Sequence, residues 1–293
     1  MGASKRHTFE LALAHGRNID SADVIALLRE VYAEGIGTRD EADELIAFDH
    51  TLTETTPDWR EFFATTIADH LLQRCEPAAS VDDKKADWLI SALSYRRRVA
   101  TASGFAAVLR LLEAAPQSPS SLAAYAIDQL RVALIAGEGP ALGNRPHFSR
   151  TIDADDVAML AHMLISAGGV SGVPVSRAEA EALFDLHDAV AGGANDRGFD
   201  DLFFKAIAHH LLFIAGVAVP ARREMLQSEL ELAVRLAQGN GQALLGPDDT
   251  AWLAGRIMRD GRATRAEFLL LQLFSGEPDD ANPTLRRFLD CAA

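Results

Sequence analysis

The chain lacks the features that mark secreted, membrane-spanning and metal-stapled proteins. It has only two cysteines, Cys75 and Cys291, which show neither zinc-ligand spacing nor the number needed for a disulfide framework. No apolar stretch is close in length to the roughly 18 residues that a membrane span requires. The first residues also lack the apolar core of a signal peptide. We therefore expect a cytoplasmic protein with two reduced thiols and no membrane contact.

Motifs of the common enzyme classes are also missing. The sequence has no Gly-x-Ser-x-Gly elbow, no Gly-x-x-x-x-Gly-Lys phosphate loop and no His-Glu-x-x-His zinc helix. These absences favour a non-enzymatic protein, for which we name no catalytic residue and no organic cofactor.

Positive charge is scarce relative to negative charge. There are 28 Lys and Arg against 42 Asp and Glu, and the formal net charge is -14. A field of that sign repels phosphate backbones and anionic membranes, so we expect no nucleic-acid partner. The short basic run Arg96-Arg97-Arg98 is interpreted as a solvated helix end.

What the sequence has in quantity is apolar, helix-forming residues. Hydrophobic residues make up 48% of the chain, Ala and Leu dominate, and Tyr and Trp occur only three times each. Unbranched side chains lose little rotamer freedom in a helix, and the apolar residues recur at spacings of three and four. The sequence therefore predicts an all-α fold with ample material for a core.

Two parts of the chain resemble each other. Residues 19–24 match 152–157, and residues 63–72 align with 203–212. Between the copies lies a stretch rich in Gly and Pro, which cannot continue a helix. We predict a pseudo-symmetric helical bundle made of two tandem copies of one multi-helix unit, arranged as an N-terminal segment at 1–18, the first unit at 19–136, a linker at 137–150 and the second unit at 151–293.

Several helix starts carry capping signals. Asp20 and Asp153 are predicted N-caps, because each directly precedes a run with helical apolar spacing. The sequences Thr38-x-x-Glu41, Ser176-x-x-Glu179 and Thr264-x-x-Glu267 are predicted capping boxes, in which hydroxyl and carboxylate satisfy backbone amides reciprocally.

Two of these turns also fit a second interpretation, cation binding. Glu34-Gly35 followed by Glu41, and Asp260-Gly261 followed by Glu267, reproduce the second half of an EF-hand loop. The first half is incomplete, since the early ligand positions of the second turn would be Arg256 and Met258. We favour capping, and keep Glu34, Glu41, Asp260 and Glu267 as candidate metal ligands.

Further candidates come from polar residues on apolar helix stripes. In each copy one predicted helix has a histidine on its apolar face, His70 in the first copy and His210 in the second. The preceding helix of each copy has Asp49 or His187 on its apolar face. If the two helices pack antiparallel, we expect Asp49 to approach His70 and His187 to approach His210. Imidazole and carboxylate groups are ligands for zinc, manganese or iron, but two per copy are fewer than a tight site uses. We therefore favour buried hydrogen bonds that anchor the helix pair.

The acidic-glycine turns, each followed by a capped helix, resemble those of the tellurite-resistance TerB-like helical domains. The resemblance is carried by Glu34-Gly35 to Glu41 and by Asp260-Gly261 to Glu267, and covers well under half of the chain. It implies an intracellular, non-enzymatic module of the kind associated with bacterial stress responses, with divalent-cation binding in some members.

Taken together, these features predict a non-catalytic helical protein that acts by binding another protein or by self-association, in the grooves that stacked helices create. The alternative is a divalent-metal-binding protein that uses the Asp/His pairs or the acidic turns.

Overall fold

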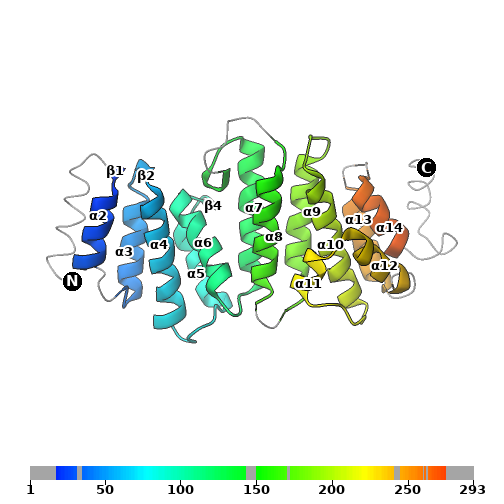
Figure 1. Cartoon of the computed structure of the whole chain (residues 1–293), viewed down its shortest axis with the longest axis horizontal. Helices are drawn as coiled ribbons and strands as arrows, with labels where there is room; N and C mark the ends of the chain where they lie inside the picture. Colours follow the sequence, from blue (N-terminus) through cyan, green and yellow to red (C-terminus); the bar gives the residue numbers. More distant parts are fainter. Residues whose placement is uncertain are drawn as a thin grey trace. The chain divides into compact units, whose positions relative to one another are not determined.

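The all-α prediction is confirmed. The computed structural model describes residues 18–31, 35–142, 150–169, 172–240, 245–259, 261 and 263–274, and these contain thirteen α-helices and four strands of two residues. The chain divides into two compact units, Met1–Ser149 and Arg150–Ala293, whose boundary lies within the stretch predicted as a linker (Figure 1). No described helix has both the length and the apolar character needed to cross a membrane. That the units are copies of one another stays a prediction.

The first unit is organised around helix α4, which packs against α6 and α2 (Figure 1). Thr56 caps α4 and Pro57 occupies its first turn, where the missing amide donor of proline is not needed. The helices of this unit are α2 (Ser21–Ala26), α3 (Arg39–Asp49), α4 (Pro57–Asp69), α5 (Asp83–Leu93), α6 (Ala102–Ala114) and α7 (Ser120–Ala136), with π-helical turns η1 (Leu27–Val31) and η2 (His70–Arg74) and a 3-10 turn η3 (Pro140–Leu142).

The unit also contains two short strand pairs. Strand β1 (Asn18–Ile19) pairs in parallel with β2 (Glu54–Thr55). Strands β3 (Ser94–Tyr95) and β4 (Arg98–Val99) form an antiparallel hairpin between α5 and α6. The interpretation of Arg96-Arg97-Arg98 as a helix end was therefore wrong: Arg96 and Arg97 form the two-residue turn of this hairpin.

The second unit is organised around helix α10, which contacts α8, α9, α11, α12 and α14. Four phenylalanines of α9 and α10 are fully buried there and supply much of the apolar core: Phe184, Phe199, Phe203 and Phe204. The helices are α8 (Ala154–Ala167), α9 (Arg177–Val190), α10 (Arg197–Ile214), α11 (Arg222–Gln227), α12 (Leu230–Asn240), α13 (Pro247–Ile257) and α14 (Arg265–Phe274).

The predicted helix caps are confirmed. Asp20 and Asp153 cap α2 and α8, each within a capping box. The Ser176 hydroxyl accepts from the Glu179 amide at 3.2 Å, and the Glu179 carboxylate accepts from the Ser176 amide at 2.8 Å. Thr38 with Glu41 and Thr264 with Glu267 form the same reciprocal bonds. Local sequence thus sets where these helices begin.

A buried lysine organises the loop between η2 and α5. The Lys85 ammonium lies within 2.6–2.9 Å of four backbone carbonyl oxygens, those of Leu71, Cys75, Pro77 and Ser80. An ammonium has three protons to donate, so it can satisfy most of this carbonyl cluster at once. The loop can be packed against the helix because its polar backbone atoms have this partner.

A buried arginine has the corresponding role in the second unit. The Arg222 guanidinium donates to the carbonyl oxygens of Leu164 at 2.8 Å and Pro174 at 2.6 Å. It also forms a two-pronged ion pair with the buried Glu179 carboxylate, at 2.9 and 2.7 Å. Gly168 leaves room for this side chain, since a Cβ there would lie 2.8 Å from Arg222 Cδ. Arg222 thereby ties the loop before α9 to α8.

Replacing Lys85 by Met should lower the free energy of unfolding by about 3 kcal/mol or more, because a set of carbonyls loses its donor and each unsatisfied buried group costs about 1–3 kcal/mol. The matched control is Lys84→Met, one residue earlier in α5 and exposed, which should stay within about 0.5 kcal/mol of wild type. Urea denaturation followed by circular dichroism measures both. Equal stabilities of the two variants would contradict the role given to Lys85.

Candidate functional site

The structure gives Asp49 and His70 separate partners. The buried Asp49 carboxylate accepts hydrogen bonds from Trp59 Nε1 at 2.7 Å and from the Thr101 hydroxyl at 2.5 Å. His70 places Nδ1 3.2 Å from the Ile36 carbonyl oxygen and Nε2 within 3.4 Å of the Cys75 sulfur. Both residues thus anchor neighbouring segments, which is the role that we favoured over metal ligation.

His187 and His210 are separated as well. His210 Nδ1 lies 2.8 Å from the Val175 carbonyl oxygen, and its ring meets the Trp252 ring edge-on at 5.8 Å. Burial lowers the pKa of His210, and the bond to the Val175 carbonyl only partly opposes that effect. His187 instead stacks on Phe203, with ring centroids 4.1 Å apart and planes 15° apart.

The direction of the helices explains why neither predicted pair forms. Asp49 and His187 lie at the C-terminal ends of α3 and α9, and they contact the N-terminal halves of α4 and α10, at Trp59 and Phe203. His210 lies seven residues after Phe203, which corresponds to about 10 Å along the helix axis. In an antiparallel pair the end of one helix lies beside the start of the next, so these side chains occupy opposite ends of the interface.

The structure brings His187 together with a different candidate, Glu267. His187 Nδ1 lies 3.7 Å from Glu267 Oε1, and His187 Nε2 lies 3.5 Å from Asp200 Oδ1, which are ion-pair distances. His187, Asp188 and Glu267 each offer a ligand atom within 4.8 Å of the others, the only such group of three among the described residues. Asp188 also pairs with Arg259 at 3.8 Å.

The charge of this cluster is set by its two carboxylates. Burial alone lowers the pKa of His187, but the contacts with Asp200 and Glu267 outweigh it and raise the pKa to about 9. His187 is thus an imidazolium at neutral pH, enclosed by α9, α10 and α14. A divalent cation at this place would have to displace that proton, because a ligating imidazole is neutral.

The acidic turns serve mainly as caps where the structure describes them. Glu41 Oε2 accepts from the Gly37 and Thr38 amides at 2.9 and 3.3 Å. Glu267 combines its cap with the approach to His187. Glu34 and Asp260, the remaining candidate ligands, lie outside the described residues.

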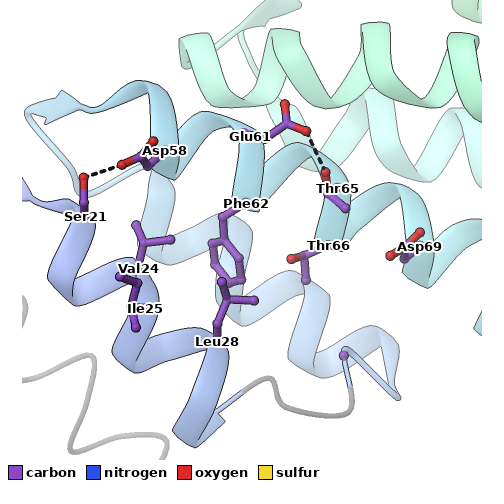
Figure 2. A pocket seen from close by; sticks show the side chains of 11 residues that line it. Ser21, Val24, Ile25, Leu28, Asp58, Glu61, Phe62, Thr65, Thr66 and Asp69 are labelled. Atoms are coloured by element: carbon purple, nitrogen blue, oxygen red, sulfur yellow. Dashed lines mark hydrogen bonds between the residues drawn. The ribbon is translucent and has the colours of Figure 1, made fainter.

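A groove of about 530 Å³ lies between α2 and α4 in the first unit (Figure 2). Its floor is apolar and consists of Val24, Ile25 and Leu28 from α2 and η1, together with Phe62 from α4. Ile25 and Leu28 are 49% and 45% exposed, although both are large hydrophobic residues. Exposed apolar side chains that line one concave surface are typical of binding sites.

The rim of this groove is acidic. Asp58, Glu61 and Asp69 project from α4 along one side, as Figure 2 shows. Ser21 on α2 donates to Asp58, and Thr65 donates to Glu61 at 3.3 Å. No Lys or Arg lines the groove among the residues that the structure describes. Glu61 also lies 3.9 Å from Arg110 of α6. The groove therefore combines an apolar floor with an acidic rim.

Sequence reasoning missed several residues that the structure brings into these sites. Ile25 and Leu28 form a second apolar stripe beside the buried Val24, and a helix with two apolar faces is a recognisable signal. Asp200 lies one turn before Phe203 on the face that meets α9, a spacing that could have linked it to His187. Asp188 had only its position next to His187 to suggest a role.

The His187 ion pairs predict a stability change at alkaline pH. The pKa is raised from 6.5 to about 9, so the stabilisation is full below about pH 6.5 and is lost as pH rises through about 9. The difference in free energy of unfolding between wild type and His187→Gln should decrease by up to about 3 kcal/mol over this pH range. Urea denaturation in the presence of a chelator measures this difference, and His162→Gln, on an exposed histidine of α8, is the control. A pH-independent difference for His187→Gln would refute the ion-pair assignment.

No protein-family model, curated protein or solved structure matches this chain. The TerB-like resemblance therefore stays a prediction.

Proposed function

We propose that this chain is a non-catalytic binding protein whose groove between α2 and α4 accepts a basic amphipathic helix of a partner protein. The observation that carries the proposal is the combination of an exposed apolar floor with an acidic rim. This role agrees with the non-enzymatic module that the TerB-like resemblance implies.

The apolar floor favours a helix as the occupant. Ile25 and Leu28 leave about half of their surface in water, and covering them with apolar side chains is favourable at roughly 25 cal/mol per Å². A groove between two helices accepts the apolar stripe of a third, with anchors at i, i+3 and i+4. Phe62 lies between the two sides of the groove and is only 6% exposed, so it forms the base on which Ile25 and Leu28 rest.

The rim favours positive charge on that helix. Asp58 and Asp69 would face Lys or Arg residues that flank the apolar stripe of the partner, while Glu61 already lies 3.9 Å from Arg110 of this chain. Charge complementarity of this kind directs the encounter and sets the orientation of the bound helix. A second copy of this chain fits less well, because its net charge of -14 adds repulsion to the contact.

A synthetic helical peptide of Leu and Lys at helical spacing should bind the full chain, and the same pattern with Glu in place of Lys should not. Replacing Ile25 and Leu28 together by Ser should raise the Kd of the Leu/Lys peptide at least about tenfold, since about 1.4 kcal/mol of apolar contact is lost. Fluorescence anisotropy measures both, and higher salt should weaken the wild-type complex.

The matched control is Ile135→Ser, because Ile135 is a similarly exposed apolar residue of α7 that does not line the groove. Equal Kd values for the double variant and this control would refute the proposal. If wild type sediments as a dimer and Leu28→Ser sediments as a monomer, the occupant of the groove is a second copy of the chain and not a partner helix.

A second candidate function is divalent-cation binding at His187, Asp188 and Glu267. It is supported by the closeness of one imidazole and two carboxylates on two helices, α9 and α14, a donor set that zinc or manganese accepts. Here His187 would act as a neutral ligand. The Glu267 carboxylate would bind the cation, and the Thr264 hydroxyl would still cap α14.

This candidate predicts near-stoichiometric metal in natively purified protein, and a melting temperature that falls on chelation and recovers on adding zinc or manganese. His187→Gln should abolish the recovery, while His162→Gln should keep it. Metal-free protein whose melting is unchanged by either ion would exclude this function and leave the cluster as an ion-pair network.

A further inference from the structure

The turn between β3 and β4 has an unusual residue pair at its tip. Arg96 and Arg97 are the two turn residues, and their φ angles are +51° and +67°. Two positive φ angles in a two-residue hairpin define a type I′ turn, which favours Asn-Gly because a Cβ is disfavoured in the left-handed region. Two arginines occupy this turn despite that preference, at a cost in conformational free energy. Such strained residues often have a functional role.

The turn is held in place from α7. The buried Gln129 side chain accepts from the Val99 amide at 2.8 Å and donates to the Arg97 carbonyl oxygen at 3.3 Å. The Tyr125 hydroxyl of α7 and the Ser94 hydroxyl of β3 are hydrogen-bonded at 2.8 Å. The backbone that presents the arginines is therefore fixed by the tertiary structure.

These groups line a pocket of about 680 Å³ between α5, the hairpin and α7. Four arginines line it against one acidic residue, Asp128, which gives four positive charges minus one, or a local net charge of +3. Asp128 is paired with Arg131 at 2.5 Å. No hydrogen bond or ion pair among the described residues engages the guanidinium groups of Arg96, Arg97 and Arg98, which are exposed. Their donors are available to a ligand.

We propose that this pocket binds a small organic phosphate that carries at least two negative charges, such as a nucleoside diphosphate. Guanidinium groups match the geometry of phosphate oxygens and can donate two hydrogen bonds each. The Tyr125 and Ser94 hydroxyls and the apolar Ile90 and Val132 side chains would contact the organic part. The volume is in the range of small-molecule sites.

A small ligand fits this pocket better than a nucleic acid. The basic lining is confined to one pocket, while the chain as a whole carries a net charge of -14 that repels a polyanion. A phosphate ester places two or more charges on a compact group, so it can engage several of the arginines that line the pocket, whereas a carboxylate carries a single charge on a planar group.

The test uses the turn itself. Replacing Arg96 by Asn and Arg97 by Gly installs the residue pair that a type I′ turn prefers, so the full chain should melt at the same or a higher temperature than wild type. The same variant should weaken binding of ADP and of inorganic pyrophosphate at least tenfold. Isothermal titration calorimetry at constant ionic strength, with a chelator present, measures the binding, and adenosine is the uncharged probe.

The control variant removes two exposed arginines outside the pocket, Arg197→Gln with Arg223→Gln, and should bind ADP as wild type does. Absence of ADP and pyrophosphate binding to wild type would overturn the proposal, as would unchanged binding in the turn variant. Citrate binding as tightly as pyrophosphate would reject the preference for phosphate. A single-stranded DNA oligonucleotide that binds more tightly than ADP would reject the small-molecule assignment.

Discussion

Backbone carbonyl groups in the turns that pack between helices need hydrogen-bond donors, and this requirement shapes both units. In the first unit it is met by the Lys85 ammonium with four carbonyl contacts, and in the second by Arg222, which joins two carbonyls to the buried Glu179 carboxylate. His70 and His210 add a ring nitrogen each to the turns before α3 and α9. A buried carbonyl without a hydrogen-bond donor lowers the free energy of unfolding by about 1–3 kcal/mol. By donating to these carbonyls, these few side chains allow the helices to pack closely.

This constraint also separates structural polar groups from those available for function. Asp49, His70 and His210 have partners in the protein, and their buried bonds explain their place on apolar helix faces. The groups at the surface differ. The groove floor at Ile25 and Leu28 is apolar and half exposed, and the exposed Arg96, Arg97 and Arg98 line a pocket with no ion pair of their own among the described residues. These exposed groups, rather than the buried polar ones, are therefore the candidates for ligand binding.

The two surface sites of the first unit have opposite electrostatic character. The groove between α2 and α4 has three carboxylates and no described basic residue, whereas the pocket beside α7 has four arginines and one aspartate. A net charge of -14 says nothing about this division, because a local field depends on which side chains converge and on the low-dielectric walls around them. The two sites would recruit ligands of opposite charge.

The helical class and the helix starts can be predicted from local sequence, because helical spacing and capping boxes act within a few residues of each other. Thr38 with Glu41 and Ser176 with Glu179 are such local signals. Which ends of the helices meet follows instead from how the helices pack in three dimensions. Periodicity places His187 on an inward face but carries no information about direction or register, so its partners became Asp200 and Glu267 rather than His210. The carbonyl contacts of Lys85 and the bonds from Gln129 to the arginine turn likewise join segments that packing brings together, which no local pattern encodes.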